Sequence, residues 1–176
     1  VIEEAFPGDI VGVYDTGNFK IGDSITEGEK LHFIGIPSFS PELFRYVENT
    51  DPLKYKQLSK GLEQLTDEGV AQLFTHKLNG RKIIGTVGAL QFDVIQFRLE
   101  HEYSASCRYE NLPLYKACWF KSNNKKQLDE FKKRKAAFLA EDNQGRDVFL
   151  ADSAFTLQMA QENFPDIAFY FTSEFN

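Results

Sequence analysis

The sequence predicts an α+β protein, in which a short β-rich segment precedes a larger domain of alternating strands and helices. Three observations lead to this prediction. Short apolar runs punctuated by glycine fill residues 5–36. Two prolines within Pro37–Pro41 hold the backbone extended and interrupt both helix and sheet ladder, so they mark a boundary. From Glu42 onward, segments in which apolar residues alternate as in a β-strand are followed by segments in which they have helical spacing.

Composition supports a folded globular protein. The chain has 176 residues, 42% hydrophobic residues and 17 Phe, enough for a substantial core. A net charge of −6 argues against a surface that binds nucleic acid throughout, although local basic patches are compatible with it. The two cysteines, Cys107 and Cys118, fit neither a disulfide framework nor a zinc site and favour a reducing cytoplasm. No apolar run reaches the roughly 18–20 residues of a membrane span, so no membrane is expected. Because Val1 is not a start methionine, we expect a piece of a longer protein.

The first 38 residues are predicted to be strands and tight turns from a sheet or barrel. The apolar runs lie within Phe6–Tyr14, Ile21–Ile25 and Lys30–Ile36, and strands are expected in each of them. Turns are expected at Pro7-Gly8-Asp9, Asp15–Asn18 and Glu27-Gly28. Because so few strands rarely form a stable sheet alone, we expect this segment either to pack against the larger domain or to leave the edges of its sheet exposed. We place the domain limit between residues 38 and 39.

The segment order from Glu42 to Glu110 predicts a ferredoxin-like core, which has the order β-α-β-β-α-β. The first helix is expected to start at Asp51-Pro52, a side-chain cap followed by proline, and to end at Gly69. Asn79-Gly80 indicates a hairpin turn. The predicted strands and second helix are, in order, Glu42–Glu48, Ala71–His76, Lys82–Val87, the helix Leu90–Tyr103 and Ser106–Glu110.

Within the first helix, Tyr55, Leu58, Leu62 and Leu65 recur at helical spacing and are predicted to face the core. Three lysines accompany them on more polar faces and are candidate contacts with a partner; the alternative is an ordinary solvated surface. They are Lys54, Lys56 and Lys60.

The strand that ends near Val87 enters the second helix with almost no loop. We expect Gly88 to supply a positive φ at this junction, and Gly85 to be structural as well. The pair lacks the third glycine of a dinucleotide fingerprint and the Gly-Lys-Ser/Thr ending of a P-loop. The helix is predicted to bury an apolar stripe made of Leu90, Val94, Ile95, Phe97 and Leu99.

The ferredoxin-like subdomain is expected to span about 39–113, and a further α/β subdomain about 114–176. This second part is predicted to add the order β-α-β-α-β, an order that is compatible with a diverged, partial repeat of the first part. Its elements are a strand at Tyr115–Phe120, a helix at Asn124–Phe138, a strand at Asp147–Ala151, a helix capped by Asp152 or Ser153, and a strand at Ile167–Phe171.

The helix Asn124–Phe138 carries the densest positive charge of the chain. Lys132, Lys133 and Arg134 belong to this run and are the second group of candidate contacts. A solvated face and a phosphate-contacting face are equally compatible with the pattern. Since the chain is acidic overall, the concentration of charge favours a local RNA-facing patch.

No constellation for catalysis, cofactor binding or metal binding is visible. His32, His76 and His101 are scattered, without the spacing of a metal site. Neither cysteine lies in a catalytic signature, and no Gly-x-Ser-x-Gly sequence occurs. We therefore predict no catalytic, cofactor-binding or metal-binding residues.

A set of short motifs recurs along the chain in a recognisable order. They are Ala5–Gly12, Ile21–Asp23, Gly28–Pro37, Ser40–Arg45, Asp51–Lys54 and Gly85–Val94. With these motifs the chain resembles the C-terminal half of bacterial peptide chain release factor 3, the class II release factors among the translational GTPases. The resemblance covers nearly the whole chain and is weakest from Asn124 onward, where fragments such as Ala160–Asp166 carry it.

The resemblance implies that residues 1–38 are the end of the family's second domain, an elongation-factor-like β-barrel, and that 39–176 are its C-terminal domain. It implies a cytoplasmic, ribosome-bound GTPase that promotes dissociation of class I release factors. Its partners would be a small-subunit protein, ribosomal RNA and its own G domain, with GTP or GDP and Mg²⁺ held in that G domain. Both groups of basic residues then become candidate ribosome contacts. This chain contains no P-loop and no Asn-Lys-x-Asp motif, so we expect the fragment itself not to be an enzyme.

Two alternatives remain. The chain could be the equivalent part of another translational GTPase of the elongation factor type. It could also be a small α+β enzyme unrelated to translation, although the absence of catalytic constellations disfavours this.

Overall fold

A computed structural model describes residues 4–14, 24–29, 31 and 40–172. The chain divides into two units, Val1–Ile34 and Gly35–Asn176, and each is described by itself. Predictions that concern the turn Asp15–Asn18, most of Lys30–Ile36 and most of the boundary Pro37–Pro41 lie outside the described residues. The domain limits at 38–39 and 113–114 stay predictions.

In the N-terminal unit the predicted turn at Pro7-Gly8-Asp9 is confirmed. The Asp9 amide donates to Phe6 O at 3.0 Å, the Phe6 amide donates to Asp9 Oδ2 at 2.8 Å, and Gly8 has a φ of +100°. The strand expected within Phe6–Tyr14 is wrong, because residues 4–14 contain no strand and Ile10 and Tyr14 are exposed. An extended segment without strand partners or a core to cover its apolar side chains gains too little to form a sheet.

The C-terminal unit starts with one complete β-α-β-β-α-β module, as predicted. Its strands pair antiparallel in the order β4-β1-β3-β2, and helices α1 and α2 pack on each other. Asp51 caps the first turn by accepting from the Leu53 amide at 3.0 Å. The elements are β1 (Leu43–Asn49), a 3-10 turn η1 (Pro52–Lys54), α1 (Tyr55–Asp67), β2 (Gln72–His76), β3 (Lys82–Thr86), α2 (Leu90–Tyr103) and β4 (Cys107–Asn111).

The rest of the unit repeats this order, which corrects the predicted β-α-β-α-β extension. The strand missing from the prediction is β6, four residues that directly follow the helical segment and form a hairpin with the next strand. The elements are β5 (Lys116–Lys121), α3 (Lys125–Arg134), a 3-10 turn η2 (Ala136–Phe138), β6 (Leu139–Asp142), β7 (Asp147–Ala151), α4 (Ala154–Asn163) and β8 (Ala168–Tyr170).

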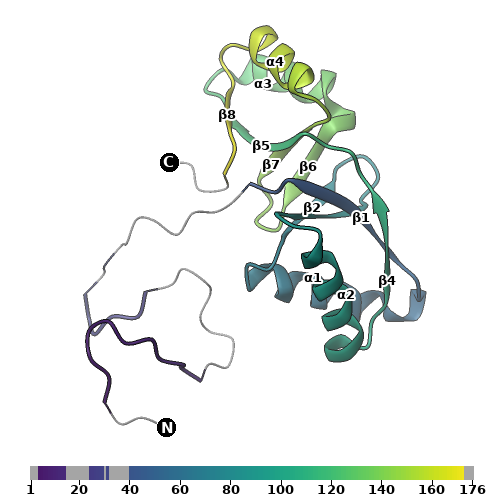
Figure 1. Cartoon of the computed structure of the whole chain (residues 1–176). Coiled ribbons are helices and arrows are strands. Elements are labelled where there is room, and N and C mark those ends of the chain that lie inside the picture. Colours follow the sequence, from purple (N-terminus) through teal and green to yellow (C-terminus); the bar gives the residue numbers. More distant parts are fainter. Residues whose placement is uncertain (1–3, 15–23, 30, 32–39, 173–176) are drawn as a thin grey trace. The chain divides into compact units, whose positions relative to one another are not determined.

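The two modules meet edge to edge. Strands β2 and β6 pair antiparallel, with Phe74 opposite Asp142, Thr75 opposite Glu141 and His76 opposite Ala140. Among the described residues this gives one eight-stranded sheet in the order β4-β1-β3-β2-β6-β7-β5-β8 (Figure 1). Because β6-β7-β5-β8 is the order of the first module reversed, the second module is a repeat of the first joined through the equivalent strand.

Three buried clusters hold this arrangement. One lies under α1 and α2 and includes Leu62 and Leu99; another lies under α3 and α4 and includes Phe131 and Phe164. The third joins the helix-free faces of both modules. Its centre is Phe74 of β2, whose ring lies 6.0 Å from that of Trp119 on β5 and 6.3 Å from that of Phe44 on β1.

The junction between β3 and α2 differs from the prediction in two ways. Gly88 does not have a positive φ, and a Cβ there would meet no atom within 4 Å. Gly85 is the position that packing requires, because a Cβ there would lie 2.7 Å from Pro41 Cβ. The loop is instead closed by the Gln91 side chain, whose Oε1 accepts from the Val87 amide at 2.8 Å and the Gly88 amide at 3.0 Å.

The buried face of α2 agrees with the prediction only for Ile95 and Leu99. Phe92, Ile95 and Leu99 face the core, whereas Leu90, Val94 and Phe97 of the predicted stripe are exposed. Both sets have helical spacing, so periodicity alone could not choose between them. The choice follows from packing, since the Phe92 ring contacts Tyr109 of β4 at 5.3 Å between ring centres.

Candidate functional site

The first group of predicted contacts lies at the start of α1. Leu58, Leu62 and Leu65 are buried and fix the helix on the sheet, so the opposite face points outward. Lys56 and Lys60 are exposed on that outward face, and Lys54 is partly exposed at the end of η1. None of the three forms an ion pair with another described residue.

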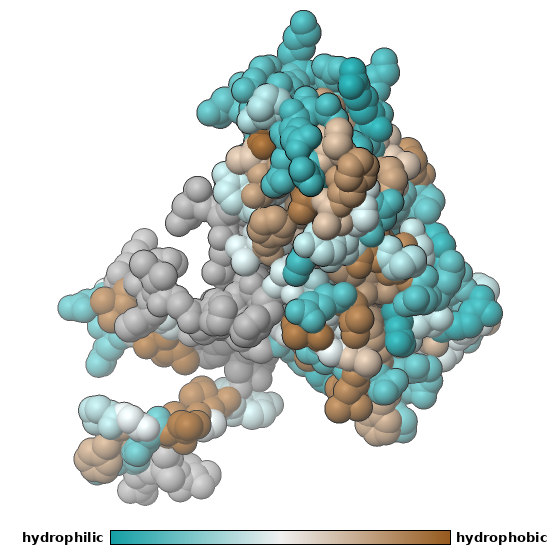
Figure 2. Space-filling model, turned by 45° about the horizontal axis from the view of Figure 1, so that its top comes forward, coloured by the Kyte–Doolittle hydropathy of each residue, from teal (hydrophilic) through white to brown (hydrophobic). Residues whose placement is uncertain are grey.

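Two apolar residues next to these lysines are also exposed. Leu53 is 89% exposed and Tyr55 is 60% exposed. The prediction that Tyr55 faces the core is wrong, because burial in α1 begins only at Leu58, where the helix meets the core shared with α2 and β2. Figure 2 shows hydrophobic side chains reaching the surface of the C-terminal unit between hydrophilic ones.

The second group lies at the end of α3, where most of its charges have partners. Lys132 Nζ lies 2.5 Å from Asp147 Oδ2, and Arg134 lies 2.5 Å from Glu130 one helical turn earlier. Lys133 is exposed. Cations in the last turn of a helix are also favoured by the helix dipole. These basic residues therefore have a structural explanation.

Asp147, the first residue of β7, joins α3 to the junction of the two modules. Its carboxylate pairs with the ammonium group of Lys132 of α3 and with that of Lys77, which directly follows β2. Burial raises the pKa of this carboxyl, but the hydrogen bonds from Lys132 and Lys77 outweigh burial and hold its pKa below the usual value. Asp147 is thus a charged anchor between β2, β7 and α3.

The structure does not bring the two predicted groups together. Helix α1 lies with α2 over the first module, and α3 lies with α4 over the second, with the strands between them (Figure 1). Any contact made by both groups would therefore involve two separate areas of a partner.

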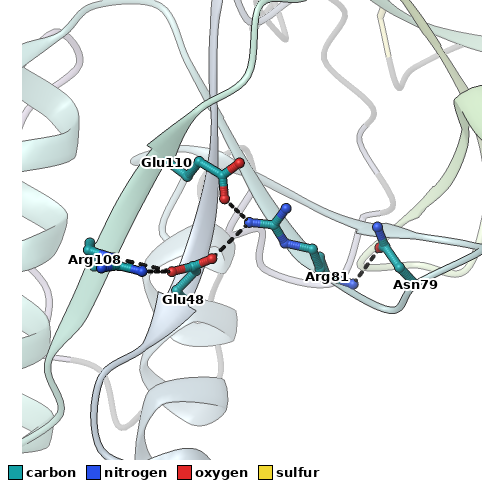
Figure 3. A network of polar contacts seen from close by, with 5 residues as sticks. All are labelled: Glu48, Asn79, Arg81, Arg108 and Glu110. Atoms are coloured by element: carbon teal, nitrogen blue, oxygen red, sulfur yellow. Dashed lines mark hydrogen bonds and ion pairs between the residues drawn. The ribbon is translucent and has the colours of Figure 1, made fainter.

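A polar network that the sequence did not predict joins strands β1 and β4 to Arg81, which directly precedes β3. Glu48 accepts from Arg81 at 3.0 Å and from Arg108 Nε at 3.2 Å, and Arg81 also pairs with Glu110 (Figure 3). The hydrogen bond from Arg108 lowers the pKa of Glu48. Arg81 lies 3.6 Å from the centre of the Tyr46 ring. The only sequence signal is opposite charge at positions that become cross-strand partners, which cannot be known before the register is known.

Two further polar side chains, those of Asp142 and His76, make hydrogen bonds that support the fold. Asp142 is buried and accepts from Trp119 Nε1 at 2.9 Å, from Arg146 Nε at 2.7 Å and from the Gln144 amide at 3.0 Å, which fixes the β6–β7 turn. His76 contacts Ala137 O through Nε2 at 3.0 Å. These groups are saturated by structural hydrogen bonds and are not arranged as an acid–base or nucleophilic pair.

The described residues offer neither a metal site nor a membrane span. No cluster of three or more His, Cys, Asp or Glu side chains that could hold a metal ion occurs within residues 4–14, 24–29, 31 and 40–172. In the same part of the chain, no helix combines the length and apolar character needed to cross a membrane.

Comparison with protein families shows a match over most of the chain. Residues 33–161 match the family model described as "Class II release factor RF3, C-terminal domain". The match includes the whole first module and the second as far as α4, and therefore both groups of basic residues.

Proposed function

Because this chain belongs to the class II release factor RF3 family through its C-terminal domain, we propose that it is the ribosome-docking part of a translational GTPase that removes class I release factors from the ribosome. The family match over residues 33–161 carries the proposal. The C-terminal domain of this family is a non-catalytic part of a translational GTPase, and release factors act on the ribosome. Cytoplasmic location follows from that setting.

The geometry is suited to docking rather than to chemistry. Two modules share one sheet and one buried cluster, which gives a rigid body with exposed lysines on α1 and a basic helix α3 on its surface. The carboxylates of Glu48 and Asp147 are paired with arginine and lysine side chains of the same unit. In the intact GTPase, we propose that the nucleotide state changes how the G domain sits on this body, while the body contacts the small subunit through a ribosomal protein and RNA.

The test is a termination assay on the full-length parent protein. Removal of the region equivalent to residues 40–172 should abolish departure of the class I release factor and leave GTP hydrolysis by the isolated G domain measurable. If the shortened factor still recycles class I release factors at the normal rate, the docking function is wrong. A translocation assay run in parallel separates this function from that of an elongation factor, since only the latter would lose translocation.

A further inference from the structure

Helix α2 carries apolar side chains on two opposite faces. One face is buried in the core and consists of Phe92, Ile95 and Leu99. Since each residue of an α-helix is rotated by about 100° from the one before, Leu90, Val94 and Phe97 line the opposite side. Their exposed fractions are 72%, 43% and 60%. We call these three residues the outer face of α2.

The core does not require the outer face, and the other helices within residues 40–172 have no equivalent. On α1 every exposed residue after Tyr55 is polar, on α3 every exposed residue is polar, and α4 exposes one large apolar side chain, Phe155. Residues spaced as i, i+4 and i+7 are neighbours on a helix, so the outer face of α2 is contiguous. Contiguous exposed apolar side chains, unlike singly scattered ones, mark interaction sites.

His101 continues the outer face by one turn and holds the Phe97 ring in place. The two rings stack with their centres 3.9 Å apart and their planes at 22°, and the His101 Nδ1–H group donates to Phe97 O at 2.8 Å. A ring that is already held loses little freedom when a partner packs on it. From Leu90 to His101 the face extends for about 16 Å, the length of about three helical turns. A helical segment of a partner has the matching length and shape.

Carboxylates form the rim of the outer face. Asp93 and Glu100 are exposed, and they lie three residues after Leu90 and Phe97, beside the apolar row. Neither forms an ion pair with another described residue. Arg98 is the one lysine or arginine of α2, and it is already paired with two glutamates. The surface is therefore apolar in the middle and negatively charged at its rim.

The sign of the rim selects the kind of partner. Carboxylates repel RNA phosphates and anionic lipid headgroups. Two copies of this chain would bring one acidic rim against another, and like charges across an interface oppose association. A partner that matches this surface has apolar side chains to cover the outer face and cations to meet its rim.

We propose that the outer face of α2 binds a helical segment of another protein that carries apolar residues at i, i+3 or i+4 and i+7 with lysine or arginine beside them. The apolar residues of this segment pack on Leu90, Val94 and Phe97, and its cations pair with Asp93 and Glu100. The site is separate from both groups of basic residues on α1 and α3. It adds a protein-binding surface of opposite charge to the same unit.

Two synthetic helical peptides test the proposal on the 176-residue chain. Both carry leucine at i, i+3 and i+7, and they differ only in having lysine or glutamate beside the leucines. Fluorescence anisotropy of each labelled peptide measures its affinity. The lysine peptide should bind at least about tenfold more tightly than the glutamate peptide, and its affinity should fall as salt is raised.

A pair of apolar substitutions locates the binding site. Leu90→Gln/Phe97→Gln should bind the lysine peptide about tenfold or more weakly, because it removes two anchors of the outer face. The matched control Leu53→Gln/Phe155→Gln removes the same two residue types from exposed positions elsewhere and should bind like the wild type.

A pair of charge substitutions tests the rim. Asp93→Asn/Glu100→Gln should bind the lysine peptide about fivefold more weakly at low salt and show a weaker dependence on salt. The matched control Asp129→Asn/Glu63→Gln removes the same charges from exposed positions of α3 and α1 and should leave affinity and salt dependence unchanged.

Thermal unfolding of each variant establishes that it is folded. The proposal is overturned if the lysine peptide does not bind the wild-type chain, if both peptides bind equally, or if either pair of α2 substitutions binds like its control. Sedimentation equilibrium at high concentration should show a monomer. A dimer that Leu90→Gln/Phe97→Gln abolishes would also overturn the proposal and show that a second copy covers the outer face.

Discussion

At the scale of single residues, the strand that carries Gly85 is packed so closely that the absence of a side chain matters. A Cβ at Gly85 would lie 2.7 and 2.8 Å from two ring atoms of Pro41 and 3.2 Å from Phe44. A Cβ at Gly88 would meet nothing within 4 Å. The two glycines, equivalent in the sequence pattern, therefore have different roles.

We predict that Gly85→Ala lowers the free energy of unfolding by about 1–3 kcal/mol, because Pro41 is a stiff ring in a buried position and overpacking forces the backbone to shift. Gly88→Ala should change it by less than about 0.5 kcal/mol. Urea denaturation of both variants measures this. Equal effects at the two positions would contradict the packing described for Gly85.

Asp147 gives a prediction that depends on pH. Its pKa in the folded protein is below the value of about 3.9 typical of an unfolded chain, so its contribution to stability is complete above about pH 4 and is lost as pH falls through the lower, folded pKa. Asp147→Asn should therefore lower the free energy of unfolding by about 1–3 kcal/mol at about pH 7, and by progressively less below about pH 4. Denaturation curves at neutral pH and near pH 3 test this, and a destabilisation that is constant with pH would refute it.

At the scale of secondary-structure elements, α2 shows which part of the fold the sequence could predict. The existence, type and order of every strand and α-helix of the first module followed from apolar spacing and turn signals. The buried face of α2 followed only in part: Ile95 and Leu99 are buried as predicted, but Leu90, Val94 and Phe97 have the same helical spacing as Phe92, Ile95 and Leu99, so spacing could not show which set faces the core. Strand β6 was missed for a related reason: it is four residues long and is defined by its pairing with β2 of the other module and with β7.

The face of α2 can be checked with two substitutions. Ile95→Ala should lower the free energy of unfolding by about 2–4 kcal/mol, since Ile95 is 1% exposed and its loss leaves a cavity. Phe97→Gln should change it by less than about 1 kcal/mol, since Phe97 is 60% exposed. A larger effect at Phe97 than at Ile95 would show that the helix is rotated from the position described.

The candidate contacts were predictable only in part. Exposure of Lys56, Lys60 and Lys133 follows from helical periodicity. Neutralisation of Lys132 by Asp147 does not, because the two residues come from different elements whose packing no local pattern reveals. The exposure of Tyr55 could not be predicted either. Tyr55 has the same helical spacing as the buried leucines, but it lies in a turn of the helix that extends beyond the core.

At the scale of the C-terminal unit, the duplicated module and its shared sheet predict cooperative unfolding. Phe74 of the first module packs on Trp119 of the second, so neither can lose its structure without exposing the common cluster. Trp119 is the chain's one tryptophan, and its fluorescence reports on that cluster. Fluorescence and far-ultraviolet circular dichroism should follow one coincident urea transition. Two separated transitions would show that the modules unfold independently.

Docking of this chain on the ribosome is tested most directly by co-sedimentation with purified ribosomes. The 176-residue chain should pellet with ribosomes at low salt, leave the pellet as salt is raised, and be displaced by an excess of the full-length release factor. A chain that remains in the supernatant at low salt, while shown by circular dichroism to be folded, would contradict the account.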